Sequence, residues 1–223
     1  MGNAEMANAK RQNILAAAAK VFETHGYAEA TVDAVAAEAG IAKGSVYNYF
    51  SSKQELFTSV FTESMSVEEK EIVARFGRTS SPVDRLMLLF DHWYERYSHH
   101  QQIGRLVLEC WASAARESHN GHVGPMSTML NDLYARWREM LTGIIAQGQQ
   151  QGQFLADLGP TMAASVLMGT LDGLTLQGIL GVGIVVDQEL LLRLKRGFLV
   201  VLGATEAAEQ LVQQETPDAN NPS

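Results

Sequence analysis

The side chains best suited to specific hydrogen bonding lie at residues 43–50, KGSVYNYF. Only Val46 and Phe50, four residues apart, form an apolar stripe at helical spacing. The other positions supply a cation, hydroxyl groups, an amide and a glycine: Lys43, Gly44, Ser45, Tyr47, Asn48 and Tyr49. A short helix of this composition buries one edge and presents the rest to a hydrogen-bonding partner.

These side chains fit the edges of base pairs in a DNA groove. Lys43 can donate to guanine acceptors or to phosphate, Ser45 is short enough to lie beside a base edge, and the Asn48 amide can pair with adenine. Gly44 removes a side chain where the backbone must approach the duplex closely. We therefore predict that this helix reads base sequence.

Other residues suit phosphate contacts, which position a protein on DNA without reading it. Tyr47 and Tyr49 have the reach and the hydroxyl for phosphate oxygens. Thr31 and Lys53 fall at the predicted starts of two helices, where free N–H groups attract anions. The predicted DNA contacts thus extend from residue 31 to residue 53.

The elements that position these residues form a helix-turn-helix. Thr31 is a suitable N-cap for a helix to about residue 39, with Val32, Val35 and Ala36 facing inward. Gly40 ends it, and a second helix follows at about 42–49. In a helix-turn-helix the second helix lies in the major groove, so residues 43–50 take the recognition position.

Helical periodicity continues along the rest of the chain, without alternating strand patterns, and predicts an all-α protein. The first helix spans about 9–25 and ends at Gly26, and an S-x-x-E capping box, Ser52 with Glu55, opens a long helix over 52–76. Further helices are predicted from Pro82, around 103–114, from Pro125, and at 160–180 and 188–213. We expect a three-helix DNA-binding head at 1–53, ordered from about residue 9, a helical body at 54–213, and a disordered tail at 214–223.

Composition and charge narrow the class of protein. The chain has 223 residues, 46% of them hydrophobic, and a net charge of −8. Five Lys or Arg and five Asp or Glu make residues 1–53 neutral, so the whole −8 lies beyond them. The longest nearly uncharged apolar stretch, 173–186, is shorter than the roughly 20 residues that cross a bilayer, and the N-terminus lacks a signal-peptide pattern. We expect a cytoplasmic protein without a membrane partner.

The last two predicted helices are apolar on more than one face. Leucine and valine crowd 190–202, and five glycines lie between 169 and 183. Such helices need cover on all sides. A second copy of the chain would supply that cover, and the alternative is a central helix inside a monomer.

The sequence resembles the tetracycline-repressor (TetR) family of bacterial transcription regulators. The resemblance covers about residues 9–61, through ILAAAAKVFETHGYAEATV, AVAAEAGIAKGSVYNYFSSKQELF and the helix lengths that follow. It implies a homodimer with an N-terminal DNA-binding head. It also implies that the C-terminal body, residues 54–213, is an effector-binding and dimerisation domain that binds a small effector and dimerises through its last two long helices. The neutral head departs from the basic surface expected of a DNA-binding protein.

Aromatic and thioether side chains in the body can line an adaptable apolar pocket, and they can equally be ordinary core packing. The candidate effector-binding residues are Phe90, Trp93, Tyr94, Tyr97, Trp111, Met129, Trp137, Met168 and Asp172. This set favours a small hydrophobic or aromatic effector. Asp91, Glu109 and Asp172 could hold a cationic or polar end of it, although each can also be an ordinary solvated or hydrogen-bonded carboxylate.

We expect no cofactor and no metal site. His99 and His100 are adjacent and point apart on a helix, and His119 and His122 flank a loop. Cys110, the one cysteine, falls on an apolar stripe, which favours an inert buried thiol over a redox sensor. No catalytic motif is present, and an enzyme with a cryptic site is the most distant alternative.

The sequence therefore predicts a ligand-responsive repressor that binds a palindromic, double-stranded operator as a homodimer and is released by its effector. The alternative is a helical carrier of small molecules whose head never meets DNA.

Overall fold

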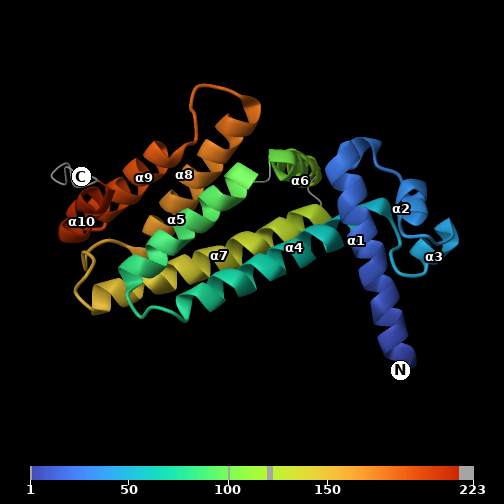
Figure 1. Ribbon diagram of the computed structural model, residues 1–223, viewed down its shortest axis with the longest axis horizontal. Coiled ribbons are helices and arrows are strands. Elements are labelled where there is room, and N and C mark those ends of the chain that lie inside the picture. Colours follow the sequence, from blue (N-terminus) through green and yellow to red (C-terminus); the bar gives the residue numbers. More distant parts are fainter. Residues whose placement is uncertain (1, 100, 120–122, 216–223) are drawn as a thin grey trace, which may run out of the picture. The chain divides into compact units, whose positions relative to one another are not determined.

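A computed structural model describes residues 2–99, 101–119 and 123–215, and the regular structure within these ranges is entirely helical (Figure 1). The helices are α1 (Asn3–Glu29), α2 (Val32–Glu38), α3 (Lys43–Tyr47), α4 (Lys53–Phe76), α5 (Pro82–His99), α6 (Gln101–His119), α7 (Pro125–Gln150), α8 (Pro160–Leu180), α9 (Gln188–Val201) and α10 (Thr205–Glu215). The all-α prediction is confirmed.

The chain divides into two compact units. The first comprises residues 1–70 and 100–134, and the second comprises residues 71–99 and 135–223. This division differs from a boundary at residue 53, because the core of the first unit joins Ile14 and Phe57 to Cys110 of α6 and Met126 of α7. A separate 1–53 head remains a prediction.

Glycine sets the end of the long first helix. Gly26 has φ +73° and interrupts α1, as the sequence predicts. Glycine adopts this left-handed backbone without the steric cost that a Cβ brings. Helical structure resumes to Glu29, and α1 begins at Asn3, six residues before the predicted start.

The start of α4 is capped in a slightly different way from the predicted capping box. Ser52 Oγ accepts a hydrogen bond from the Glu55 N–H at 3.0 Å, as expected. The Glu55 carboxylate, however, accepts from the N–H and the hydroxyl of Ser51, and these hydrogen bonds lower its pKa. The hydrogen bond to Ser52 Oγ is therefore as predicted, whereas the Glu55 carboxylate binds Ser51 instead of the Ser52 N–H.

The second unit is built around its own core. Leu86 and Phe90 of α5 pack with Ile145 of α7, Leu167 of α8 and Leu199 of α9, and all five are buried. Pro82, Pro125 and Pro160 are the first residues of α5, α7 and α8, as predicted. Proline suits a first helical position because the N–H that it lacks has no partner there.

The prediction of one final helix over 188–213 is wrong. Gly203, with φ +82°, separates α9 from α10. The Leu155 N–H donates to the Leu202 carbonyl at 2.8 Å, and the Leu155 side chain fills the space that a Cβ on Gly203 would need. The predicted tail at 214–223 lies outside the described residues except for 214 and 215, which belong to α10.

Helix α8 carries a buried face and an exposed apolar face. Ala164 and Leu167 lie in the core, whereas Met162, Val166 and Leu180 are more than half exposed. The helix has 21 residues and an 18-residue window of mean hydropathy 1.3. By length and composition, α8 could therefore span a bilayer. The prediction that no segment of the chain is long enough to do so, which was based on residues 173–186, is wrong. Because one face packs into the core of the second unit, the exposed face is what needs cover.

Candidate nucleic-acid interface

Helices α2 and α3 are joined by a tight turn at Gly40, which has φ +68°. The Ile41 N–H donates to the Ala36 carbonyl at 2.9 Å, so the chain reverses directly after α2. Val35 and Ala36 are buried on the inner side of α2. These features make residues 31–50 a helix-turn-helix.

Burial fixes the orientation of α3. Val46 and Phe50 are 1% and 2% exposed, and both lie in the core of the first unit. The helix is shorter than the predicted 42–49, since residues 48 and 49 already belong to the turn that follows it.

The outer side of α3 carries the predicted base-reading and phosphate-binding groups. Tyr47 is 47% exposed. Lys43, Gly44 and Asn48 are also exposed, while Ser45 and Tyr49 are half-buried. A Cβ on Gly44 would meet nothing within 4 Å, so packing inside the chain does not require a glycine there. Close approach of an external surface would account for it.

Lys43 is paired within the helix-turn-helix. Its ammonium donates to the Asp33 carboxylate of α2 at 2.7 Å, and that hydrogen bond and charge raise the pKa of Lys43. Both side chains are exposed. An exposed pair contributes little stability, so Lys43 can exchange Asp33 for a phosphate or a guanine at small cost.

Thr31 is the predicted N-cap of α2. Its hydroxyl oxygen accepts a hydrogen bond from the Ala34 N–H at 3.1 Å. The hydroxyl hydrogen is not used in that bond and can serve a phosphate oxygen. Thr31 itself is exposed.

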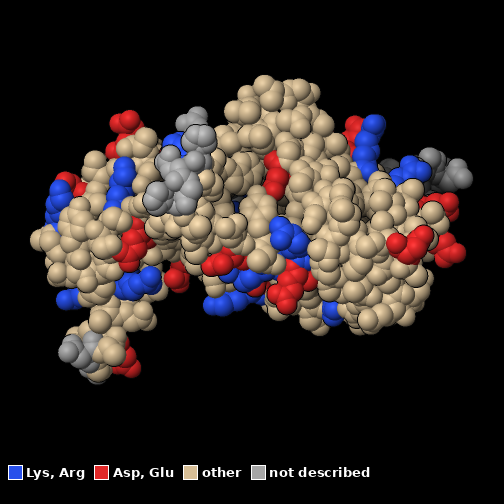
Figure 2. Space-filling model, turned by 180° about the vertical axis from the view of Figure 1, so that it is seen from behind, with Lys and Arg blue, Asp and Glu red and all other residues tan. Residues whose placement is uncertain are grey.

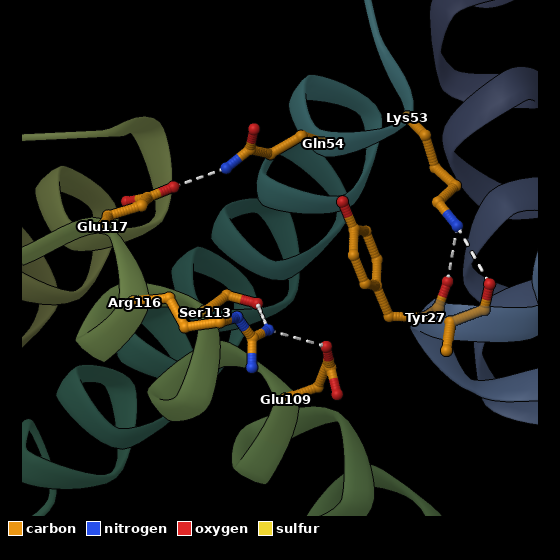
Figure 3. A network of polar contacts seen from close by, with 8 residues as sticks. Tyr27, Lys53, Gln54, Glu109, Ser113, Arg116 and Glu117 are labelled. Carbon is orange, nitrogen blue, oxygen red and sulfur yellow. Dashed lines mark hydrogen bonds and ion pairs between the residues drawn. The ribbon is translucent and has the colours of Figure 1, made fainter. Parts of the chain in front are cut away.

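Lys53, the other residue predicted at a helix start, has a structural role inside the chain (Figure 3). Its ammonium donates to the carbonyls of Tyr27, Ala28 and Ala30 at 2.8, 3.2 and 3.0 Å, and lies 4.6 Å from the centre of the Tyr27 ring. It therefore neutralises carbonyls at the end of α1 that lack helical partners. A contact of Lys53 with DNA remains a prediction.

Two further residues of α1 contact the helix-turn-helix, and they were not predicted from the sequence. The Arg11 guanidinium lies 5.3 Å from the centre of the Phe50 ring, and Asn13 Nδ2 donates to the Ala39 carbonyl at 3.0 Å. Both are long-range contacts from an otherwise ordinary helix surface. No local pattern in the sequence marks them.

Charges of both signs are interspersed on the surface that Figure 2 shows, and the described residues form no large basic patch on that face. The neutral balance of residues 1–53 agrees with this picture. The prediction that two heads act together to bind DNA firmly rests on this small number of cations in each head.

The candidate effector residues are divided between the two units. Trp111 and Met129 belong to the first unit, and the other seven belong to the second. Trp111 and Tyr134 line a groove of about 290 Å³ between α6 and α7, together with Ala114, Ala115, Ser118, Ser127, Leu130 and Asn131. Met129 lines a separate, larger and more polar groove that includes Arg11 and Asp132.

In the second unit the aromatic candidates pack closely against one another. Phe90 is fully buried beside Phe198, with ring centres 5.5 Å apart. Trp93 stacks on Tyr97 and donates from its indole N–H to Thr175 Oγ1 at 3.0 Å. Trp137 stacks on His92, and Tyr94, Met168 and Asp172 are half-buried. These contacts show packing, and effector binding by these residues stays a prediction.

Two of the three carboxylates predicted to hold a polar end of the effector form ion pairs within the chain. Asp91 forms an ion pair with Lys195, and Glu109 pairs with Arg116 at 3.3 Å. Cys110 is buried, and burial raises the pKa of its thiol to about 12, as an inert core thiol requires. The described part of the chain contains no group of three potential metal ligands, and His100 and His122 lie outside it.

The fold and the oriented α3 define a class: helix-turn-helix DNA-binding proteins with an all-helical body. Comparison with known families shows to which family within that class the chain belongs. The model described as "bacterial regulatory proteins, tetR family" matches residues 14–60, and that described as "BetI-type transcriptional repressor, C-terminal" matches residues 82–199. The chain belongs to the TetR family of bacterial regulatory proteins, and it is a DNA-binding transcriptional regulator.

Similar proteins agree with that assignment. The fatty acid metabolism regulator protein of Bacillus subtilis is 23% identical over 73% of this chain and 80% of its own length. The transcriptional repressor KstR2 of Mycobacterium tuberculosis is 29% identical over 68% of this chain and 72% of its own. The structure of FadR from Bacillus subtilis in complex with stearoyl-CoA superposes with a TM-score of 0.68, at 22% identity over 87% of this chain and 98% of that one.

Proposed function

We propose that this regulator is a cytoplasmic repressor that binds a palindromic operator as a homodimer and dissociates when a small hydrophobic or aromatic effector binds. One observation supports it most strongly. Val46 and Phe50 anchor α3 in the core, and this leaves Tyr47 and Asn48 facing outward. A recognition helix needs this arrangement in order to enter a major groove.

The homodimer is supported by the exposed stripe on α8. Met162, Val166, Gly169, Gly173 and Leu180 recur at helical spacing, and Met162 is 67% exposed. A Cβ on either glycine would meet nothing within 4 Å, so contacts inside the chain do not call for small residues there. Small residues in an apolar stripe allow another helix to approach closely, and we infer that α8 of a second copy does so.

The effector class is supported by the residues that line the groove between α6 and α7. Trp111 and Tyr134 offer apolar aromatic surface, and Asn131 and Ser118 supply hydrogen bonds at its edge. A structure of the FadR relative contains stearoyl-CoA, which has a long apolar chain. An effector with a substantial apolar part fits both observations.

Release from DNA would be a shift between two populations. The effector favours an arrangement in which the two α3 helices no longer match successive major grooves, and operator DNA favours the other. Thermodynamic linkage requires that DNA weaken effector binding by the same factor.

The test is a band shift with the DNA upstream of the gene, using variants of α3. Tyr47→Ala and Lys43→Ala each remove a predicted contact, and we expect each to weaken the complex at least about tenfold. Lys20→Ala is the matched control, because Lys20 is also an exposed lysine paired with a carboxylate of α2, Glu38, and it lies outside α3. It should bind like the unmodified protein.

The oligomeric state of each variant is measured alongside. If Tyr47→Ala and Lys43→Ala bind the DNA as tightly as Lys20→Ala, the proposal is wrong. Loss of the dimer in Tyr47→Ala would show that α3 has a packing role instead. No specific complex with any variant, or with the unmodified protein, would favour the small-molecule carrier.

A further inference from the structure

Donor groups from two helices converge on the carboxylate of Glu117, near the end of α6, and Figure 3 shows the one from Gln54 of α4. Gln54 Nε2, in the first turn of α4, donates to Glu117 Oε1 at 2.5 Å. Ser127, in the first turn of α7, donates to Oε2 from its N–H at 2.8 Å and from its hydroxyl at 2.9 Å. One side chain thus joins α4, α6 and α7 within the first unit.

Two further features fit a charged acceptor at this site. A Cβ on Gly124 would lie 2.2 Å from the carboxyl carbon of Glu117, so the carboxylate would have to shift from this position beside a larger residue. Burial by itself raises the pKa of Glu117, but the hydrogen bonds from Ser127, Met126 and Gln54 outweigh it, and the pKa is lowered. The carboxylate also occupies the N-terminus of α7, where backbone N–H groups lack helical partners.

The turn of α4 that Glu117 holds is also the turn that holds α1. Lys53 and Gln54 are consecutive, and their side chains reach in different directions. Lys53 binds the carbonyls at the end of α1, and Gln54 binds Glu117 of α6. Since α1 packs against α2 through the shared core, the first turn of α4 is a junction between the helix-turn-helix and the pair of helices α6 and α7.

We propose that Glu117 is the positioning residue that fixes the helix-turn-helix relative to α6 and α7, and that its hydrogen bonds to Gln54 and Ser127 are the contact an effector loosens. Ser127 also lines the groove between α6 and α7, next to Trp111 and Tyr134. An occupant of that groove therefore touches a residue bonded to Glu117. The regulatory part rests on the proposed function, while the positioning part does not.

Hydrogen-bond chemistry provides a specific variant and a specific rescue. A carboxylate accepts on both oxygens, and Glu117→Leu removes both acceptors while keeping much of the side-chain volume. Glu117→Gln alone leaves the junction intact, because the Gln54 amide can turn its carbonyl oxygen toward the new NH₂ group while the new carbonyl accepts from Ser127. Gln54→Glu alone places two carboxylates together. The double exchange, Gln54→Glu with Glu117→Gln, restores donor to acceptor on both sides.

The experiment measures the distance between two spin labels in the free protein. Labels are attached at Ala37→Cys on α2 and Asp132→Cys on α7, both exposed, in a Cys110→Ala background. Labelled protein is diluted with unlabelled protein so that only pairs within one chain contribute. Glu109→Leu is the matched control, because Glu109 is another carboxylate of α6 whose partner, Arg116, lies on the same helix.

We expect Glu117→Leu and Gln54→Glu each to broaden the distance distribution about twofold, as further orientations become populated. Glu109→Leu should leave it unchanged, and Gln54→Glu with Glu117→Gln should restore it. If these hydrogen bonds do not set the orientation, the double exchange is no narrower than Gln54→Glu alone. An unchanged distribution in Glu117→Leu, or no restoration in the double variant, overturns the proposal. The measurement uses neither DNA nor effector, so its failure is separate from a failure of operator binding.

Discussion

At the scale of single residues, the lysines show what residue type predicts and what it leaves open. Lys43 and Lys53 are both cations near helix starts, and the sequence assigns both to DNA. In the structure Lys43 pairs with an exposed carboxylate, whereas Lys53 bonds three carbonyls at the end of α1. Those carbonyls lie more than twenty residues away in the chain, and no local pattern reports such a contact.

The role of Lys53 can be measured through stability. Lys53→Met keeps most of the apolar stem and removes the charged donor, so carbonyls at the end of α1 lose their partner. We expect the free energy of unfolding to fall by about 1–3 kcal/mol. Urea denaturation followed by circular dichroism checks this, with Lys10→Met on the exposed side of α1 as control. Equal stability of the two variants would contradict the assigned role.

His92 predicts a dependence of stability on pH. It is 6% exposed, its Nε2 has no hydrogen-bond partner among the described residues, and burial, then the charge of Arg75, lowers its pKa below the ordinary 6.5. As the pH falls below about 6.5, His92 is protonated in the unfolded chain but stays neutral in the folded chain until a lower pH. The free energy of unfolding therefore decreases.

His92→Phe should therefore lose less stability than the unmodified protein between pH 7 and pH 5. Urea denaturation at both pH values measures the difference. His25→Phe, which changes an exposed histidine of α1, serves as control and should retain the original pH dependence. The account of His92 fails if its replacement leaves that dependence unaltered.

At the scale of elements, the starts of capped helices were predictable, whereas the start of α1 and some helix ends were not. Proline, threonine and aspartate act within one turn, so Pro82, Thr31 and Asp187 mark their helices from sequence alone. Gly203 escaped because apolar residues continue at helical spacing across it. Its left-handed backbone becomes visible only with the packing of Leu155.

The exposed face of α8 gives a prediction at this scale. Val166 is 54% exposed, and Val166→Glu would bury a charge if α8 packs against its copy. We expect the dissociation constant of the dimer to rise at least about tenfold, with the helical content unchanged. Light scattering after size-exclusion chromatography measures this. Val123→Glu, at a valine that is 80% exposed in the first unit, should remain dimeric. A dimeric Val166→Glu would remove α8 from the interface.

At the scale of the whole molecule, periodicity predicted the all-α class, and the TetR-type motif predicted the family. The boundary between compact units was not predictable, because α6 returns from the distant sequence to pack on α1 and α4. The same limit affects the effector site. Residue type indicated aromatic surface, but the division of Trp111 and Met129 from the other seven candidates follows from tertiary packing.

The central claim is that two copies of α3 read DNA together. Selection of binding sequences from random double-stranded DNA by the unmodified protein tests it most directly. Two-fold symmetry predicts an enriched inverted repeat, with half-sites centred about one helical turn apart, roughly 34–36 Å, or somewhat more if neighbouring grooves are used. Enrichment of an unrepeated sequence, or no enrichment at all, would contradict it.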